Sequence, residues 1–196
     1  PREAESNVAQ FILDRWSPRS FVPDEITQKE LLALLDAGRW APSAYNGQPW
    51  RFIYARRNTP DWDHFISWLI PFNRSWAANA SAIVYVASRT VTESSSSGEP
   101  VEAPTHAFDA GAASLLIQLQ ANHNGWSTHP ISGFDKELAH TGLGLLGDHQ
   151  LHAAIIIGRR GDPTLLPENL QSREKPSSRA PLETLAFEGR LHVNTP

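Results

Sequence analysis

The sequence predicts a single domain in which helices and β-strands are mixed along the chain. Its 196 residues suit one domain, and a domain of this size buries roughly 70% of the surface that the unfolded chain exposes. Apolar residues recur at helical spacing in some segments and form short runs of strand length in others. Hydrophobic residues make up 40% of the chain, which is enough for a core without disulfides.

Two helices are predicted in the first forty residues. Residues 8–13 have the apolar spacing of a short helix, which leads into a proline-containing loop. Thr27 and Glu30 form the residue pair of a capping box, and a cluster of leucines continues at helical spacing to about Arg39. Pro42 ends this second helix.

Three strands and two further helices follow. Residues 51–56 alternate aromatic side chains with polar or small ones, and residues 82–87 and 153–157 are apolar runs of buried-strand length. Helical faces are expected at 62–69 and at 108–123. The second of these helices is apolar on much of its circumference, so we expect it to be central or at an interface.

Two segments lack periodicity, and both are assigned to the same domain, 1–196. Residues 91–104 are rich in Ser, Glu, Gly and Pro, with four consecutive serines, which predicts a flexible surface loop. Residues 159–196 form a long, proline-rich C-terminal arm. Because such an arm seldom packs alone, we expect it to wrap the domain or a partner subunit.

The composition excludes several classes of function. With 17 Lys and Arg against 21 Asp and Glu, the net charge is −4, so no basic field would attract nucleic acid or an anionic membrane. The absence of cysteine excludes disulfides and thiolate chemistry. The first ten residues resemble neither a signal peptide nor a membrane span, which favours a cytoplasmic protein. The absence of methionine is typical of a trimmed chain or of modified methionines left out of the sequence.

The segment RWSPRSF, residues 15–21, is the first candidate binding loop. It places the guanidinium groups of Arg15 and Arg19 beside the hydroxyl of Ser17 and the rigid Pro18. Because arginine binds phosphate through a planar fork, this loop is a candidate anion site in an otherwise acidic protein. Taken alone, two solvated surface arginines are the more common explanation.

The segment APSAYNGQPW, residues 41–50, is the second candidate. It places Ser43, Asn46 and Gln48 between two prolines, directly after a helix and before a strand. Side-chain amides offer a donor and an acceptor together, as the pyrimidine edge of a flavin requires. The alternative is an Asx-turn loop without a ligand.

Together the two segments, separated by a helix, resemble the opening of the nitroreductase family, in which an RxSxR loop and an APSxxNxQPW loop bind FMN. The resemblance continues in order over essentially the whole chain, through FNRSW, GWSTHPISGFD, IIIG and SREKPSSRAPL. It implies an α+β, nitroreductase-like three-layer fold, with a mixed, mostly antiparallel sheet flanked by helices. It also implies a homodimer with two FMN sites at the interface, where the helix 108–123 lies and the arm wraps the partner subunit.

The resemblance also assigns FMN contacts to residues of this chain. Those at the phosphate and ribityl chain are Arg15, Trp16, Ser17 and Arg179. Those at the N1, O2 and N3 edge are Arg19 and Asn73. Those lining the ring or ribityl chain from the second loop are Pro42, Ser43, Asn46 and Gln48. Those whose backbone lies near N5 are Pro130, Ile131, Ser132 and Gly133.

One position departs from the family pattern. Some relatives carry a lysine two positions before the terminal arginine, where this chain has Ser177. Either Lys175 substitutes for that lysine, or the phosphate rests on three arginines.

The implied activity is a two-electron reduction of small acceptors such as nitroaromatics or quinones, driven by NAD(P)H in a ping-pong mechanism. The cofactor supplies the redox chemistry, so no catalytic side chain is expected, and Arg19 gives electrostatic support to the reduced flavin. The alternatives are another flavin reaction (reductive dehalogenation, flavin cleavage or dehydrogenation), a non-catalytic FMN-binding protein, and a cofactor-free domain that binds another phosphate ligand. The choice between NADH and NADPH stays open.

Three competing signals carry less weight. GLGLLG, residues 142–147, has the spacing GxGxxG but follows no strand and precedes no helix, so a dinucleotide fold is not expected. His106 and Asp109 share a helix face without a convincing third ligand, so no metal site is predicted. The tryptophans at 62, 68 and 76 stand in apolar helical settings and are assigned to the core.

Overall fold

The computed structural model describes residues 2–94 and 96–191. Within them, five strands form one sheet in the order β1-β7-β3-β2, with β6 also paired to β7, and every pairing is antiparallel. The strands are β1 (Phe21–Val22), β2 (Trp50–Arg56), β3 (Ala82–Arg89), β6 (Ser127–Ile131) and β7 (His149–Arg160). The sheet matches the mostly antiparallel sheet expected from the sequence.

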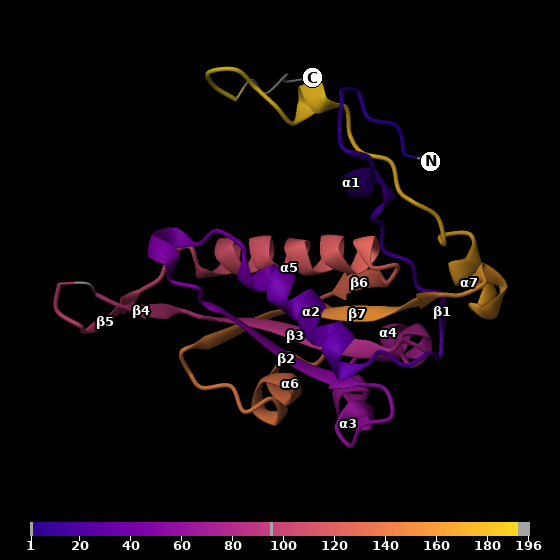
Figure 1. The fold of residues 1–196 in the computed structure, drawn as a ribbon, viewed down its shortest axis with the longest axis horizontal. Coiled ribbons are helices and arrows are strands. Elements are labelled where there is room, and N and C mark those ends of the chain that lie inside the picture. Colours follow the sequence, from indigo (N-terminus) through magenta and orange to yellow (C-terminus); the bar gives the residue numbers. More distant parts are fainter. Residues whose placement is uncertain (1, 95, 192–196) are drawn as a thin grey trace.

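Helices cover both faces of this sheet, which gives three layers (Figure 1). On one face lie α2 (Gln28–Arg39) and α5 (His106–His123), and on the other lie α3 (Trp62–Ser67), α4 (Pro71–Ala77) and α6 (Lys136–Gly142). Successive side chains of β3 alternate between two buried clusters, because a strand points neighbouring residues to opposite faces. The three tryptophans at 62, 68 and 76 are buried in one of these clusters, as expected. The fold class predicted from the sequence is confirmed.

Local signals in α2 explain both its start and its packing. The Thr27 hydroxyl accepts a hydrogen bond from the Glu30 N–H at 3.2 Å, and the Glu30 carboxylate accepts one from the Thr27 N–H at 2.9 Å, so the predicted capping box is present. Near the other end, a Cβ on Gly38 would lie 2.7 Å from Ile117 Cγ1. Glycine at this position therefore allows α2 to pack closely against α5.

Residues 91–104 form a β-hairpin rather than an irregular loop. The strands β4 (Val91–Glu93) and β5 (Pro100–Glu102) pair antiparallel and project from the body beside the start of α5 (Figure 1). Ser94, Ser96, Ser97 and Gly98, the last at φ 71°, lie in the turn, where the Ser94 N–H donates to the Glu99 carbonyl at 2.9 Å. The composition of the turn dominates the sequence signal and hides the short strands on either side of it.

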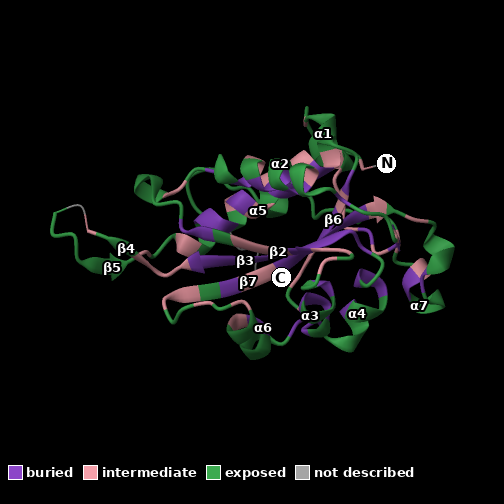
Figure 2. Ribbon diagram, turned by 60° about the horizontal axis from the view of Figure 1, so that its bottom comes forward, coloured by how far each residue is buried: buried purple, intermediate pink, exposed green. Residues whose placement is uncertain are grey.

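The C-terminal arm leaves the body after β7. It contains the short helix α7 (Glu168–Gln171), and most of its side chains beyond that helix are exposed (Figure 2). The arm runs beside the N-terminal segment that carries α1 (Gln10–Asp14), at a distance from the sheet (Figure 1). Wrapping of a partner subunit by this arm stays a prediction. In the described part of the chain, no helix has the length and apolarity needed to cross a membrane.

Candidate functional site

Three arginines from distant parts of the chain meet beside α1. Burial, and then the neighbouring guanidinium groups of Arg2 and Arg179, lower the pKa of Arg15. Arg15 Nη1 lies 3.4 Å from Ser17 Oγ, and Arg179 Nη1 donates to Ser177 Oγ at 2.9 Å. The structure therefore brings together Arg15, Ser17 and Arg179, which the sequence assigned to one phosphate site.

These three guanidinium groups have no carboxylate partner among residues 2–94 and 96–191. Like charges at close range raise one another's free energy unless an anion neutralises them. A phosphate group is the kind of anion that such forked donors bind. The arrangement is therefore suited to a phosphate ligand.

The loop between α1 and β1 is held by Glu174 of the C-terminal arm. The Glu174 carboxylate accepts hydrogen bonds from the Arg19 N–H at 2.8 and 3.0 Å and from the Ser20 N–H at 2.9 Å. Burial and the charge of Arg173 lower the pKa of Arg19, against a smaller raising effect of Glu174. Arg19 Nε is buried without a hydrogen-bond partner, so this side chain has a donor available for a ligand.

His129 of β6 contacts the same loop at Pro18. Its Nδ1 lies 2.9 Å from the Pro18 carbonyl, and its ring lies 4.8 Å from that of Trp76. Because a carbonyl only accepts, Nδ1 carries the proton of a neutral imidazole. Burial is the main reason that the pKa of His129 falls to about 4, and the charges of Arg19 and Arg15 add to the effect. His129 is therefore a neutral donor that fixes the loop.

Asn73 and the segment 130–133, both assigned to FMN contacts by the resemblance, lie against each other. The buried Asn73 amide donates from Nδ2 to the Gly133 carbonyl at 2.9 Å. A Cβ on Gly133 would lie 2.4 Å from that nitrogen, so the close approach requires glycine. Pro130 and Ile131 end strand β6, and Ser132 leads to this glycine.

The second predicted loop has an unusual backbone. Tyr45, Asn46 and Gln48 have φ values of 51°, 56° and 45°, and each such residue costs of order 1–3 kcal/mol. Ser43 Oγ accepts the Gln48 N–H at 3.0 Å, and Asp109 at the start of α5 accepts the Ala44 N–H at 3.2 Å. These contacts hold Tyr45 fully exposed. Pro42, Ser43, Asn46 and Gln48 thus lie together on a preformed, strained loop.

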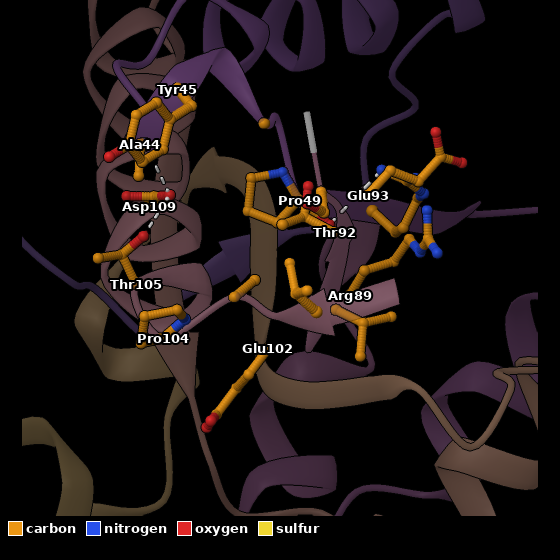
Figure 3. Close-up of a pocket in the computed structure, with 16 residues that line it drawn as sticks. Ala44, Tyr45, Pro49, Arg89, Thr92, Glu93, Glu102, Pro104, Thr105 and Asp109 are labelled. Carbon is orange, nitrogen blue, oxygen red and sulfur yellow. Dashed lines mark hydrogen bonds between the residues drawn. The ribbon is translucent and has the colours of Figure 1, made fainter. Parts of the chain in front are cut away.

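A cavity of about 440 Å³ opens beside this loop (Figure 3). The start of α5 and the β4–β5 hairpin form its other walls, so Tyr45 and Asp109 face Arg89 and Glu93 across it. Arg89 is paired with Asp148 at 3.2 Å. Sequence reasoning did not identify this cavity, because the hairpin that lines it was expected to be an irregular loop.

Within one chain the two predicted halves of the site remain apart. The arginine loop lies near one end of α5 and the strained loop beside the other end (Figure 1). α5 has 18 residues, which corresponds to a length of about 27 Å at the usual helical rise. The structure therefore assembles each half without joining the second loop to Arg15, Arg19 and Arg179.

The comparisons with known proteins agree on one family. Residues 12–61 match the sequence model of the nitroreductase family. A crystal structure of an oxidoreductase containing FMN is 42% identical, with a TM-score of 0.94, and the match covers 97% of this chain and 96% of that one. The chain belongs to the nitroreductase family. In this nitroreductase-family chain, the residues that match the family model include the two N-terminal loops and the helix between them.

A curated relative and a second solved structure resemble this chain more distantly. YdgI of Bacillus subtilis (strain 168), provisionally named an NAD(P)H nitroreductase, is 24% identical over 186 residues, which cover 78% of this chain and 88% of YdgI. A provisionally assigned nitroreductase of Exiguobacterium sibiricum 255-15, solved in complex with FMN, has a TM-score of 0.74 at 21% identity, with 95% of this chain and 99% of that chain covered. At this identity, the second comparison shows the shared fold alone.

Proposed function

We propose that this nitroreductase-family protein uses NAD(P)H to reduce small, flat acceptors such as nitroaromatics or quinones by a ping-pong mechanism. The coarser class, an FMN-dependent oxidoreductase, follows from the family and from the 42% identical oxidoreductase containing FMN. The observation that carries the proposal is the meeting of Arg15, Ser17 and Arg179 without a carboxylate partner in the described residues.

The chemistry of the donors fits FMN. Arg15, Ser17 and Arg179 would hold its phosphate, with Trp16 contributing its backbone. Arg19 has a buried, unpartnered Nε donor, which the acceptor atoms at the flavin N1 and O2 edge would satisfy. When bound, FMN would accept two electrons from the nicotinamide donor and pass them to the acceptor.

The residues around the flavin would bind and orient it. Asn73 would contact the pyrimidine edge of the flavin. Its side-chain amide donates to the Gly133 carbonyl, so it is also held by the segment 130–133, whose backbone would lie near N5. The positive charge of Arg19 would stabilise negative charge on the pyrimidine ring of the reduced cofactor. Replacing Arg19 with Gln should therefore lower the FMN reduction potential, on the order of 30 mV if about 1.4 kcal/mol is lost in this two-electron couple.

The second loop would reach the flavin of a second copy of the chain. Pro42, Ser43, Asn46 and Gln48 are held in shape on each chain but lie away from its own arginine loop. The outer face of α5 carries the exposed apolar side chains Phe108 and Leu115, which are 81% and 47% exposed. Exposed apolar surface of this kind is typical of an interface. A homodimer with two FMN sites would bury that face and complete both sites.

The cavity beside Tyr45 is the proposed acceptor slot. Its lining combines the cations Arg51 and Arg89 with three acids, Glu93, Glu102 and Asp109, so charges of both signs face the cavity and a strongly charged ligand is not favoured. Apolar groups supply much of the remaining lining. A neutral, flat acceptor that packs against the exposed Tyr45 ring fits this composition.

The visible spectrum of the purified protein, alone and with added FMN, tests the function. Flavin absorption that bleaches anaerobically with NADPH or NADH is the expected result. Absorption that resists both donors would instead favour another flavin reaction or an FMN-binding protein without turnover. Absence of flavin under every condition would refute the cofactor and each residue assigned to it.

Two variants test the dimer. Leu115→Glu should shift the protein from dimer to monomer in sedimentation and lower its FMN content, since both halves of the site would be separated. Leu138→Glu is the matched control, because Leu138 on α6 is also exposed, at 60%, and this variant should leave the dimer intact. A dimer that survives Leu115→Glu with full flavin would contradict this interface. The cytoplasmic location expected from the sequence stays a prediction.

A further inference from the structure

Arg2 lies at the junction of the N-terminal segment, the arginine loop and the C-terminal arm. Its guanidinium donates to the Arg15 carbonyl through Nη1 and to the Ser177 carbonyl through Nε at 3.1 Å. The two acceptors belong to segments that are far apart in sequence. The side chain is thereby fixed beside both Arg15 and Arg179.

Three guanidinium groups lie close together at this junction. Burial and then the charge of Arg179 lower the pKa of Arg2, and burial and then the charges of Arg2 and Arg179 lower the pKa of Arg15. Arg2 and Arg179 line a cavity of about 590 Å³ together with Glu3 and Glu5. The Glu5 carboxylate accepts the Leu182 N–H at 3.2 and 3.3 Å. No ion pair joins the three arginines to an acid in the described residues. Holding them together without an anion is unfavourable.

We propose that Arg2 is a third phosphate-binding arginine of the FMN site, acting with Arg15 and Arg179. This inference rests on the proposed function, because the phosphate is that of FMN. Three forked cations match the double negative charge and the several acceptor oxygens of a terminal phosphate. Arg2 also contacts the backbone of Ser177, the position where some relatives carry a lysine. Arg2 therefore supplies a cation at the point where the family pattern lacks one in this chain.

Lys175 is the alternative source of that charge. It is exposed, and its ammonium group forms no hydrogen bond or ion pair within residues 2–94 and 96–191. Arg2, in contrast, is tied by two hydrogen bonds to the segments that carry the other two arginines. The geometry favours Arg2 over Lys175.

Comparison of FMN with riboflavin, which lacks the phosphate, tests the proposal on the full chain stripped of flavin. Flavin fluorescence titration would give both dissociation constants. A charge-assisted hydrogen bond contributes about 1.5–3 kcal/mol, so Arg2→Gln should weaken FMN binding roughly 10- to 100-fold. Riboflavin binding should not change. Arg2→Lys should restore part of the FMN affinity, because it keeps the charge but loses the fork.

Two matched variants serve as controls. Lys175→Gln should leave FMN affinity unchanged, as should Arg39→Gln, which removes an exposed arginine paired with Asp36. Equal weakening of FMN and riboflavin in Arg2→Gln would overturn the proposal, because Arg2 would then act only on the shape of the segment. Unchanged FMN affinity in Arg2→Gln, or a loss confined to Lys175→Gln, would also overturn it. If the wild-type chain binds neither flavin, the proposed function itself fails.

Discussion

The loop that carries Arg19 should depend on one carboxylate of the C-terminal arm. Glu174 accepts two backbone N–H groups, those of Arg19 and Ser20, at 2.8 to 3.0 Å. Ser20 is 1% exposed, so water cannot readily replace the carboxylate at its N–H. Glu174→Ala would leave both donors without a partner.

The expected loss follows from these two contacts. Hydrogen bonds to a charged group contribute about 1.5–3 kcal/mol each. Since Glu174 itself is partly exposed, the lower end of that range applies, which gives a total of about 3 kcal/mol. For a chain of this length, that loss corresponds to a fall in Tm of about 6 to 12 °C.

Thermal unfolding of the flavin-free protein, followed by circular dichroism at one protein concentration, measures the effect. Glu188→Ala is the matched control, because Glu188 is an exposed glutamate of the same arm whose side chain makes no hydrogen bond in the described structure. Its Tm should stay within about 1 °C of the wild type, since surface substitutions usually change stability by less than 0.5 kcal/mol. Equal Tm values for the two variants would refute the anchoring role of Glu174.

Three further substitutions probe the body of the protein. Because the pKa of His129 falls to about 4 from an ordinary 6.5, only the unfolded chain takes up its proton as the pH falls. Urea unfolding should therefore show a loss of about 2 kcal/mol from pH 7.5 to pH 5, and His129→Gln should remove that loss. Gly142→Ala would place a Cβ 2.2 Å from the Trp68 ring, and this overpacking should cost about 1–3 kcal/mol in the same assay. Thr27→Ala removes the cap of α2 and should cost about 1 kcal/mol, whereas unchanged stability would show that the capping box is dispensable.

Structural features that depend on residues close together in the chain could be predicted from the sequence. The capping box needs residues only three positions apart, and the buried strand β3 is a continuous apolar run, so both appear in the structure as expected. The hairpin at 91–104 was missed because its strands are three residues each and the turn composition outweighs them. The β-propensity of single residues predicts three-residue strands poorly, because pairing across the hairpin decides their structure.

Candidate site residues could be named from the sequence only where a family motif assigns them a role. Ser17, Arg19 and Asn73 stand in motifs to which the resemblance assigns FMN contacts. Arg2 stands outside these motifs, and Glu174 and His129 stand in matching segments that assign them no role. The partners of these last three lie 175, 155 and 111 residues away along the chain. A single sequence gives no signal for pairing over such distances, so their roles emerge only from the fold.

The residues assigned to the FMN site lie in two different parts of the molecule. Arg19, Asn73 and Gly133 lie on or beside the sheet, whereas Arg2 and Arg179 lie on two segments that pack mainly against each other outside the core. The flavin ring would therefore meet the rigid body, and the phosphate would meet the two outer segments. Since those segments hold a cluster of like charges, an anion bound there would stabilise their mutual packing. Phosphate binding and the docking of the arm on a partner subunit would then be linked, because both depend on the position of the same segment.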